Sequence, residues 1–211
     1  MEKFTDRYEA GAMLATVLSD YANRSDVIVL ALPRGGVPVA YKISSALAVP
    51  LDVFIVRKLG VPGHEELAMG AIAMGNSVVL NEEIVHQLNI SKVTIEGVIQ
   101  SEQEELKRRE LLYRRHRHFP KLTDKNIILV DDGIATGATM RAAIQALRQY
   151  KPASIIVAVP VASIEACQEM EKLVDRLVCI LKPKNFYAVG QWYQDFSQTS
   201  DDEVSALLNE K

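Results

Sequence analysis

Two adjacent aspartates, Asp131 and Asp132, are the strongest chemical feature of the sequence. They directly follow an apolar run, residues 127–130, which has the length and branched side chains of a strand buried on both faces of a parallel sheet. Open α/β sheets bind ligands just beyond the carboxyl ends of their strands. The sequence therefore predicts an acid pair placed to accept hydrogen bonds from sugar hydroxyls or to hold a divalent cation.

The residues after the acid pair suit a phosphate group. The stretch 136–139 can present consecutive backbone N–H groups, and its two threonines add hydroxyl donors. It leads into a helix predicted over residues 140–150, whose positive dipole end favours an anion. The candidate phosphate-binding residues are Ala135, Thr136, Gly137, Ala138 and Thr139.

A second strand, glycine loop and helix occurs near the amino terminus. The apolar run 27–32 leads into a tight loop, and a helix is predicted over residues 39–47. Gly35 and Gly36 let the backbone approach a bound anion closely, and Arg34 adds a planar charge suited to phosphate oxygens. A Gly-Gly turn alone is more often only a turn, so the functional interpretation depends on the acid pair elsewhere in the chain.

A third candidate is the basic pair Arg57 and Lys58, which ends a strand predicted over residues 51–56. The stretch 59–70 lacks a helical or alternating pattern, and a loop of this length inside a compact domain is usually functional or disordered. We expect a mobile loop that covers the site. Without a phosphate motif, the basic pair would equally fit a solvated strand edge.

The remaining pattern places these motifs in an α/β fold. Further strands are predicted over residues 154–159 and 177–181, and helices over residues 8–21, 163–173 and 201–208. A hairpin is predicted from residues 71–74 and 77–80, with a short helix capped by Asn81 and a longer one, residues 92–118, capped by Ser91. Strands alternating with helices are typical of a mainly parallel central sheet with helices on both faces.

The long helix is heavily charged. Three Glu/Arg pairs four residues apart are typical of a solvated face: Glu104 with Arg108, Glu105 with Arg109, and Glu110 with Arg114. A denser basic cluster over residues 114–118 could meet a phosphate or RNA. We favour the simpler interpretation of a helix end that complements its dipole.

Composition bounds the class of protein. With 211 residues and a 48% hydrophobic share, we expect a single domain over residues 1–211. The net charge of −3 gives no basic footprint for indiscriminate nucleic-acid binding, and no apolar run has the length of a membrane span or signal peptide. We expect a cytoplasmic protein with a small-molecule partner. Cys167 and Cys179 fit no disulfide or metal pattern and are interpreted as reduced core thiols.

The stretch from Asp131 to Thr139 resembles the phosphoribosyl pyrophosphate (PRPP) motif of type I phosphoribosyltransferases. It departs from that motif at Gly133, where the family usually has a branched apolar residue, and at Ala138, which is often Gly. The resemblance implies a Rossmann-like fold in which Asp131, Asp132 and residues 135–139 bind PRPP. It also implies that Arg34, Gly35 and Gly36 bind pyrophosphate, together with Arg57 and Lys58 from the catalytic-loop region.

The segment 182–199 is rich in aromatic residues and is similar to the hood of purine phosphoribosyltransferases. The resemblance implies that Phe186, Tyr187 or Trp192 covers the base and that Asp195 lies near the metal. One extra residue separates Gly190 from Asp195 compared with the family pattern. A hydrophobic plug over the end of the sheet is an equally good interpretation of the same residues.

The resemblance thus implies a transferase that uses PRPP and Mg²⁺ to transfer phosphoribose to a nitrogenous base, with Asp131, Asp132, Arg57 and Lys58 as catalytic residues. It also implies a homodimer. Two alternatives stay open: a regulator that senses PRPP and contacts nucleic acid through residues 114–118, and a hydrolase that uses water instead of a base. The acidic net charge counts against the regulator.

Overall fold

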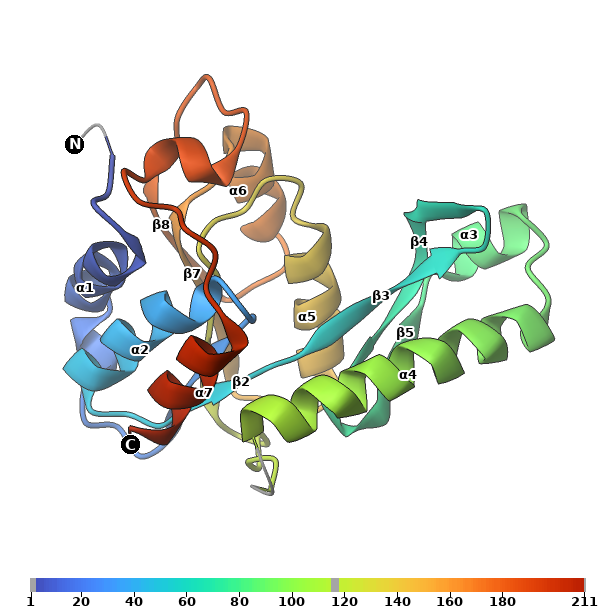
Figure 1. Ribbon diagram of the computed structural model, residues 1–211, viewed down its shortest axis with the longest axis horizontal. Coiled ribbons are helices and arrows are strands. Elements are labelled where there is room, and N and C mark those ends of the chain that lie inside the picture. Colours follow the sequence, from blue (N-terminus) through green and yellow to red (C-terminus); the bar gives the residue numbers. More distant parts are fainter. Residues whose placement is uncertain (1–2, 115–117, 211) are drawn as a thin grey trace.

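A five-stranded parallel sheet lies at the centre of the computed structural model, which describes residues 3–114 and 118–210 (Figure 1). The strands in spatial order are β2 (Leu51–Val53), β1 (Val27–Ala31), β6 (Asn126–Val130), β7 (Ser154–Val161) and β8 (Arg176–Leu181). Every neighbouring pair runs parallel. The predicted α/β fold with a mainly parallel sheet is confirmed.

Helices cover both faces of this sheet, because side chains alternate along each central strand. Ile128 of β6 packs in the core beneath one helical layer, and its neighbour Leu129 packs beneath the other. The first layer contains α1 (Arg7–Val17), α2 (Gly36–Leu47) and α7 (Asp201–Asn209). The second contains α5 (Ala138–Arg148) and α6 (Ile164–Met170). Three short 3₁₀ helices, Ser19–Tyr21, Met74–Asn76 and Val189–Trp192, complete the helical elements of the described residues.

A second, antiparallel sheet projects from the core with two helices, and we call this unit the arm (Figure 1). The arm comprises β3 (Val56–Val61), β4 (His64–Ala73), β5 (Ser77–Leu80), α3 (Glu82–Gln87) and α4 (Lys92–Arg114). Its base contacts the core through α5 and α7. None of the helices in the two described ranges is long and apolar enough to cross a lipid bilayer.

The prediction of an irregular loop over residues 59–70 is wrong. Most of this stretch forms the β3–β4 hairpin, which turns at Gly63 with a φ of 81°. The strands are stabilised by burial that the local pattern hides: Leu59 and Met69 are fully buried. The hairpin forms because α4 covers an apolar face of the arm.

The strand predicted over residues 51–56 is divided between the two sheets. β2 ends at Val53, and β3 begins at Val56 in the arm. Phe54 lies between them, fully buried, with its ring centroid 6.4 Å from that of Tyr150. The predicted strand is thus a crossing from one sheet to the other rather than a single strand.

The predicted hairpin and helix caps of the arm are confirmed. β4 and β5 pair in antiparallel register from Gly70 opposite Leu80 to Ala73 opposite Ser77. The Asn81 side chain accepts a hydrogen bond from the backbone N–H of Ile84, and Ser91 Oγ accepts one from Thr94 at 3.1 Å. The helix that Ser91 caps is described as far as Arg114, and residues 115–117 of the predicted basic cluster lie outside the described residues.

Two of the three ion pairs predicted on α4 form, Glu105 with Arg109 and Glu110 with Arg114. Arg108 instead pairs with Glu105. Arg114 is not a solvated helix end, because its side chain is only 2% exposed and its guanidinium donates to Asp52 at 3.0 Å. This buried pair joins the end of α4 to β2, and Arg114 also donates to the backbone oxygen of His118 at 2.6 Å.

We predict that Arg114→Ala lowers the free energy of unfolding by about 3–5 kcal/mol, because it leaves the Asp52 carboxylate buried without its partner. Arg108→Ala is the matched control on the same helix, since the Arg108 side chain is 60% exposed, and it should change stability by about 0.5 kcal/mol or less. Urea unfolding measures both. Equal losses in the two variants would contradict the role assigned to the Arg114 pair.

Candidate functional site

The candidate site lies where the order of the sheet changes direction. β1 and β6 are neighbours in the sheet, and their last paired residues are Ala31 and Val130. The helix after β1 packs on one face of the sheet, and the helix after β6 packs on the other. Such a divergence opens a crevice at the carboxyl ends of the two strands, which is the usual ligand site of an open α/β sheet.

The loop after β1 packs directly against the acid pair after β6. A Cβ atom on Gly35 would stand 2.0 Å from Asp132 Oδ2, and one on Gly36 would stand 2.7 Å from the backbone oxygen of Val130. Only residues without a side chain permit this approach. The structure thus brings together four of the predicted site residues, Gly35, Gly36, Asp131 and Asp132.

The predicted phosphate loop leads into α5. Gly137 caps this helix with a φ of 75°, a left-handed conformation that favours glycine. Thr136, Ala138 and Thr139 are exposed around it. The free N–H groups of the first helical turn and the helix dipole make such a helix start suitable for an anion.

Arg34 lies beside the start of α7 rather than over the acid pair. Its Nη1 is 3.7 Å from Asp201 Oδ1, and the peptide bond that joins it to Pro33 is cis. Tyr113 Oη donates to the same Asp201 oxygen at 2.6 Å, and burial together with this acceptor raises the pKa of Tyr113 to about 12. The Asp201 carboxylate therefore links Arg34 to the end of α4.

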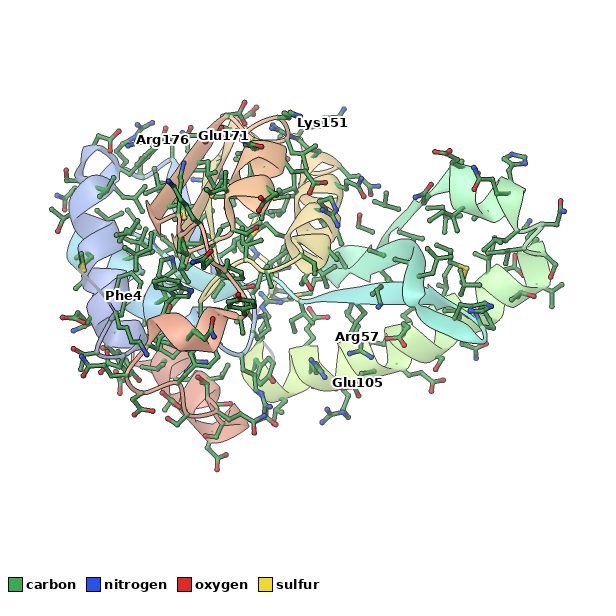
Figure 2. The ribbon with its side chains drawn as sticks, turned by 90° about the horizontal axis from the view of Figure 1, so that it is seen from above. Phe4, Arg57, Glu105, Lys151, Glu171 and Arg176 are labelled. Carbon is green, nitrogen blue, oxygen red and sulfur yellow. The ribbon has the colours of Figure 1, made fainter. Side chains whose placement is uncertain are left out.

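Arg57 and Lys58 both line a cavity beside α4, but their other contacts differ. Arg57 Nε donates to Glu102 at 2.6 Å, and Figure 2 shows Arg57 pointing toward α4. Lys58 lines a cavity of about 570 Å³ between the arm and α5, together with Ala138 of the phosphate loop and Arg141. The structure thus brings Lys58, and not Arg57, beside a predicted phosphate-binding residue.

The acid pair is electrostatically unusual. Burial raises the pKa of Asp131 well above its ordinary value, and the neighbouring Asp132 charge adds to the effect. Burial also raises the pKa of Asp132, while the Arg7 guanidinium opposes that rise. The backbone N–H of Asp132 donates to Asp131 Oδ1 at 2.9 Å. Two adjacent carboxyls whose pKa values are raised by burial are typical of a functional site.

Sequence reasoning missed two residues of the site, Arg7 and Tyr193. Arg7 Nε donates to Asp132 Oδ2 at 2.9 Å from a position 125 residues away in the chain. Tyr193 Oη donates to the backbone oxygen of Asp132 at 2.6 Å. Arg7 belongs to no local pattern that points to the acid pair, whereas Tyr193 lies in the aromatic segment 182–199, which the family resemblance already associates with the site.

The predicted hood aromatics have separate surroundings. Phe186 and Trp192 pack against a small core that contains Phe4 and Tyr193, whereas Tyr187 is 82% exposed. The Nε1 atom of Trp192 is buried without a hydrogen-bond partner in the part of the chain that the structure describes. The hood segment is therefore in part the hydrophobic plug considered as the alternative.

The hood also accounts for Gly133, the departure from the family motif. A Cβ atom on Gly133 would stand 2.5 Å from a methyl group of Val189. Val189 thus occupies the space that a branched residue at position 133 would need. In this chain the hood packs against the acid motif because Val189 fills the space that a side chain at position 133 would take.

Asp195 is exposed, and its carboxylate accepts from the backbone N–H of Ser197 at 2.9 Å. Within residues 3–114 and 118–210, no three or more His, Cys, Asp or Glu side chains form a cluster suited to a metal ion. The structure therefore does not join Asp195 to Asp131 and Asp132 in one protein ligand set. The acid pair still fits Mg²⁺ that arrives with a diphosphate, because such Mg²⁺ needs only one or two protein carboxylates.

Comparison with known proteins agrees with this geometry. The phosphoribosyl transferase domain matches residues 4–196. This chain belongs to the phosphoribosyl transferase family. It is 43% identical over 209 residues to the "Putative phosphoribosyl transferase Rv0571c" of Mycobacterium tuberculosis, a match that covers 99% of this chain and 47% of that protein. The chain thus spans about half the length of the curated relatives it matches.

Two solved structures place this phosphoribosyl transferase chain among related folds. The crystal structure of TT1426 from Thermus thermophilus is 38% identical with a TM-score of 0.89, and the match covers 99% of this chain and 98% of that one. A hypoxanthine phosphoribosyltransferase from Staphylococcus aureus is 9% identical with a TM-score of 0.50, covering 84% and 73% of the two chains. The second likeness concerns the fold alone.

The raised pKa of Asp131 predicts how stability depends on pH. Because the folded chain holds this proton more tightly than the unfolded chain, the free energy of unfolding falls as pH rises from about 4 through the folded pKa. Asp131→Asn should therefore be more stable than the wild type at pH 7, and this difference should shrink as the pH falls toward about 4.

Thermal unfolding across this pH range measures the effect. Asp195→Asn is the control, because a hydrogen bond from a backbone N–H lowers the pKa of Asp195. Removing the Asp195 carboxylate should therefore reduce stability at neutral pH. If the Asp131→Asn variant is less stable than the wild type at pH 7, the ionised Asp131 carboxyl does not destabilise the folded protein.

Proposed function

We propose that this chain transfers the phosphoribosyl group of PRPP to a nitrogenous base, with Mg²⁺ as cofactor and release of pyrophosphate. One observation carries the proposal: the Gly35–Gly36 loop lies against Asp131 and Asp132 beside the start of α5. A sugar that carries a phosphate at one end and a diphosphate at the other matches this arrangement. A purine is the favoured base, because the hood resembles that of purine enzymes.

The acid pair and the phosphate loop would orient the sugar. Asp131 and Asp132 accept hydrogen bonds from the ribose hydroxyls and stabilise the positive charge that develops on the ring during displacement at the anomeric carbon. Residues 135–139 bind the 5′-phosphate through the N–H groups at the start of α5. Anchoring at this distance from the reacting carbon lowers the barrier, because the sugar is already oriented.

The glycine loop and the arm would bind the leaving group. Gly35 and Gly36 let the backbone approach the pyrophosphate, and Arg34 and Lys58 supply positive charge as negative charge develops on it. Mg²⁺ neutralises part of that charge when bound. Arg57 would reach the pyrophosphate only after leaving Glu102, to which it donates in this structure.

A second candidate is hydrolysis of the sugar pyrophosphate with water in place of the base, because two of the three predicted hood aromatics pack against a small core. Phe186 and Trp192 pack among other side chains, so Tyr187 is the predicted hood aromatic whose ring is most exposed for stacking. The regulator hypothesis receives less support, because Arg114 of the basic cluster is buried against Asp52. The family resemblance also supports a homodimer.

The first test is the acid pair. Asp131→Asn combined with Asp132→Asn should weaken binding of PRPP in the presence of Mg²⁺ by about a hundredfold or more, because two charged acceptors for the ribose hydroxyls are lost. Calorimetric titration measures the affinity, and thermal unfolding checks the fold. A double variant that binds PRPP like the wild type would show that the acid pair has another role.

The reaction itself is tested by pyrophosphate release from PRPP over a panel of bases. Release that depends on one base supports the transferase, and release without any base supports the hydrolase. If neither occurs while PRPP still binds, the sensing regulator becomes the better account.

Arg57 and Lys58 can be separated in the same assay. Lys58→Ala should lower turnover by roughly ten- to a hundredfold and PRPP affinity by less. The reason is that the positive charge of Lys58 interacts most strongly with the pyrophosphate when negative charge develops on it in the transition state. Arg57→Ala is the matched control from the adjacent position of β3 and should have the smaller effect on turnover, because Arg57 is already paired with Glu102. The reverse order would mean that the arm reorients when substrate binds.

A further inference from the structure

Arg7 contacts the acid pair from outside the strand, loop and helix that carry the motif. It is the first residue of α1, and its side chain is 10% exposed. Both Nε and Nη2 lie 2.9 Å from one oxygen of Asp132, Oδ2. Arg7 therefore holds the Asp132 carboxylate through Oδ2.

The guanidinium group of Arg7 is itself held from two sides by the hood. Its Nη1 donates to the backbone oxygen of Ser197 at 2.7 Å, and its central carbon lies 4.0 Å from the centroid of the Phe196 ring. A planar cation with an ionic partner, a backbone acceptor and an aromatic face is restricted to one orientation. Arg7 is therefore a rigid support for Asp132.

The amino-terminal segment that delivers Arg7 is hydrogen-bonded to the hood along its length. The backbone N–H of Phe4 donates to Trp192 at 2.8 Å, and the backbone oxygen of Phe4 accepts from Gln194 at 2.8 Å. Phe4, which is labelled in Figure 2, is fully buried in a small core with Val161 and Tyr193. The side chain of Asp6 then caps α1 by accepting from the backbone N–H of Glu9 at 2.8 Å, so Arg7 starts the helix at a defined place.

We infer that Arg7 is a positioning residue for the acid pair: it holds the Asp132 carboxylate against Gly35 in the orientation that accepts a ribose hydroxyl. This inference rests on the proposed function for the identity of the ligand. It assigns to the amino-terminal helix and the hood a joint role in substrate binding that the motif itself does not contain. Arg7 touches no reacting atom and acts only through Asp132.

Three variants test the inference by calorimetric titration with PRPP and Mg²⁺. Arg7→Gln should weaken PRPP binding by roughly ten- to a hundredfold, the range for one lost charged hydrogen bond. Arg7→Lys keeps the charge without the planar fork, so it should recover only part of the loss. In an Asp132→Asn background, Arg7→Gln should have no further effect on affinity.

A merely structural role predicts a different pattern. In that case the effects of Arg7→Gln and Asp132→Asn on PRPP affinity would multiply, and the inference would be overturned. Arg176→Gln is the matched control, because Arg176 also combines an aspartate partner, Asp20, at 2.8 Å with an aromatic ring, that of Tyr21. It should lower thermal stability without changing PRPP affinity.

A ligand-free measurement separates this inference from the proposed function. A wild-type protein that fails to bind PRPP overturns the proposed function. A crystal structure of unliganded Arg7→Gln then decides the role of Arg7 alone: the inference expects Asp132 Oδ2 to leave its place against Gly35, and an unchanged Asp132 orientation overturns it. If Arg7→Gln does not fold, the Arg7→Lys structure and its partial affinity give the same decision.

Discussion

β1 and β6 run parallel for five residues, from Val27 opposite Asn126 to Ala31 opposite Val130. The candidate site depends on this pairing, because it brings the ends of two strands together while the chain leaves them toward opposite faces of the sheet. The glycine loop and the acid pair then meet at van der Waals distance, which excludes a side chain at Gly35 and Gly36. A slip of one residue would separate the loop from the acids and exchange the buried faces of the strand.

That geometry places two carboxylates side by side at a partly buried position, which is electrostatically unfavourable. The surrounding residues of the site reduce this cost. Burial raises the pKa values of both acids, and Arg7 offsets part of the effect at Asp132. The counter-charge comes from the amino-terminal helix, and the hood restricts it through Ser197 and Phe196. Hood, amino terminus and acid motif therefore form one connected unit, in which Val189 packs over Gly133.

The base of the arm is joined to the core by buried and partly buried polar contacts. Arg114 binds Asp52 at the end of α4, and Tyr113 one residue earlier donates to Asp201, which also lies near Arg34. The arm carries Lys58 on β3 to a cavity shared with Ala138 of the phosphate loop. A displacement of α4 would thus move Lys58 on β3, and through Asp201 it would also change the surroundings of Arg34.

Local patterns in the sequence determined the strands of the central sheet, the loops that follow β1 and β6, the acid pair and the helix caps at Asn81 and Ser91, because each depends on residues within one turn or one strand. The tertiary structure alone decided the rest. The stretch 59–70 becomes a hairpin because α4 packs over Leu59 and Met69, and Arg57 pairs with Glu102, which lies 45 residues away in the chain. Arg7 reaches Asp132 across 125 residues. Such contacts follow from packing between distant elements, and no local spacing of residue types encodes them.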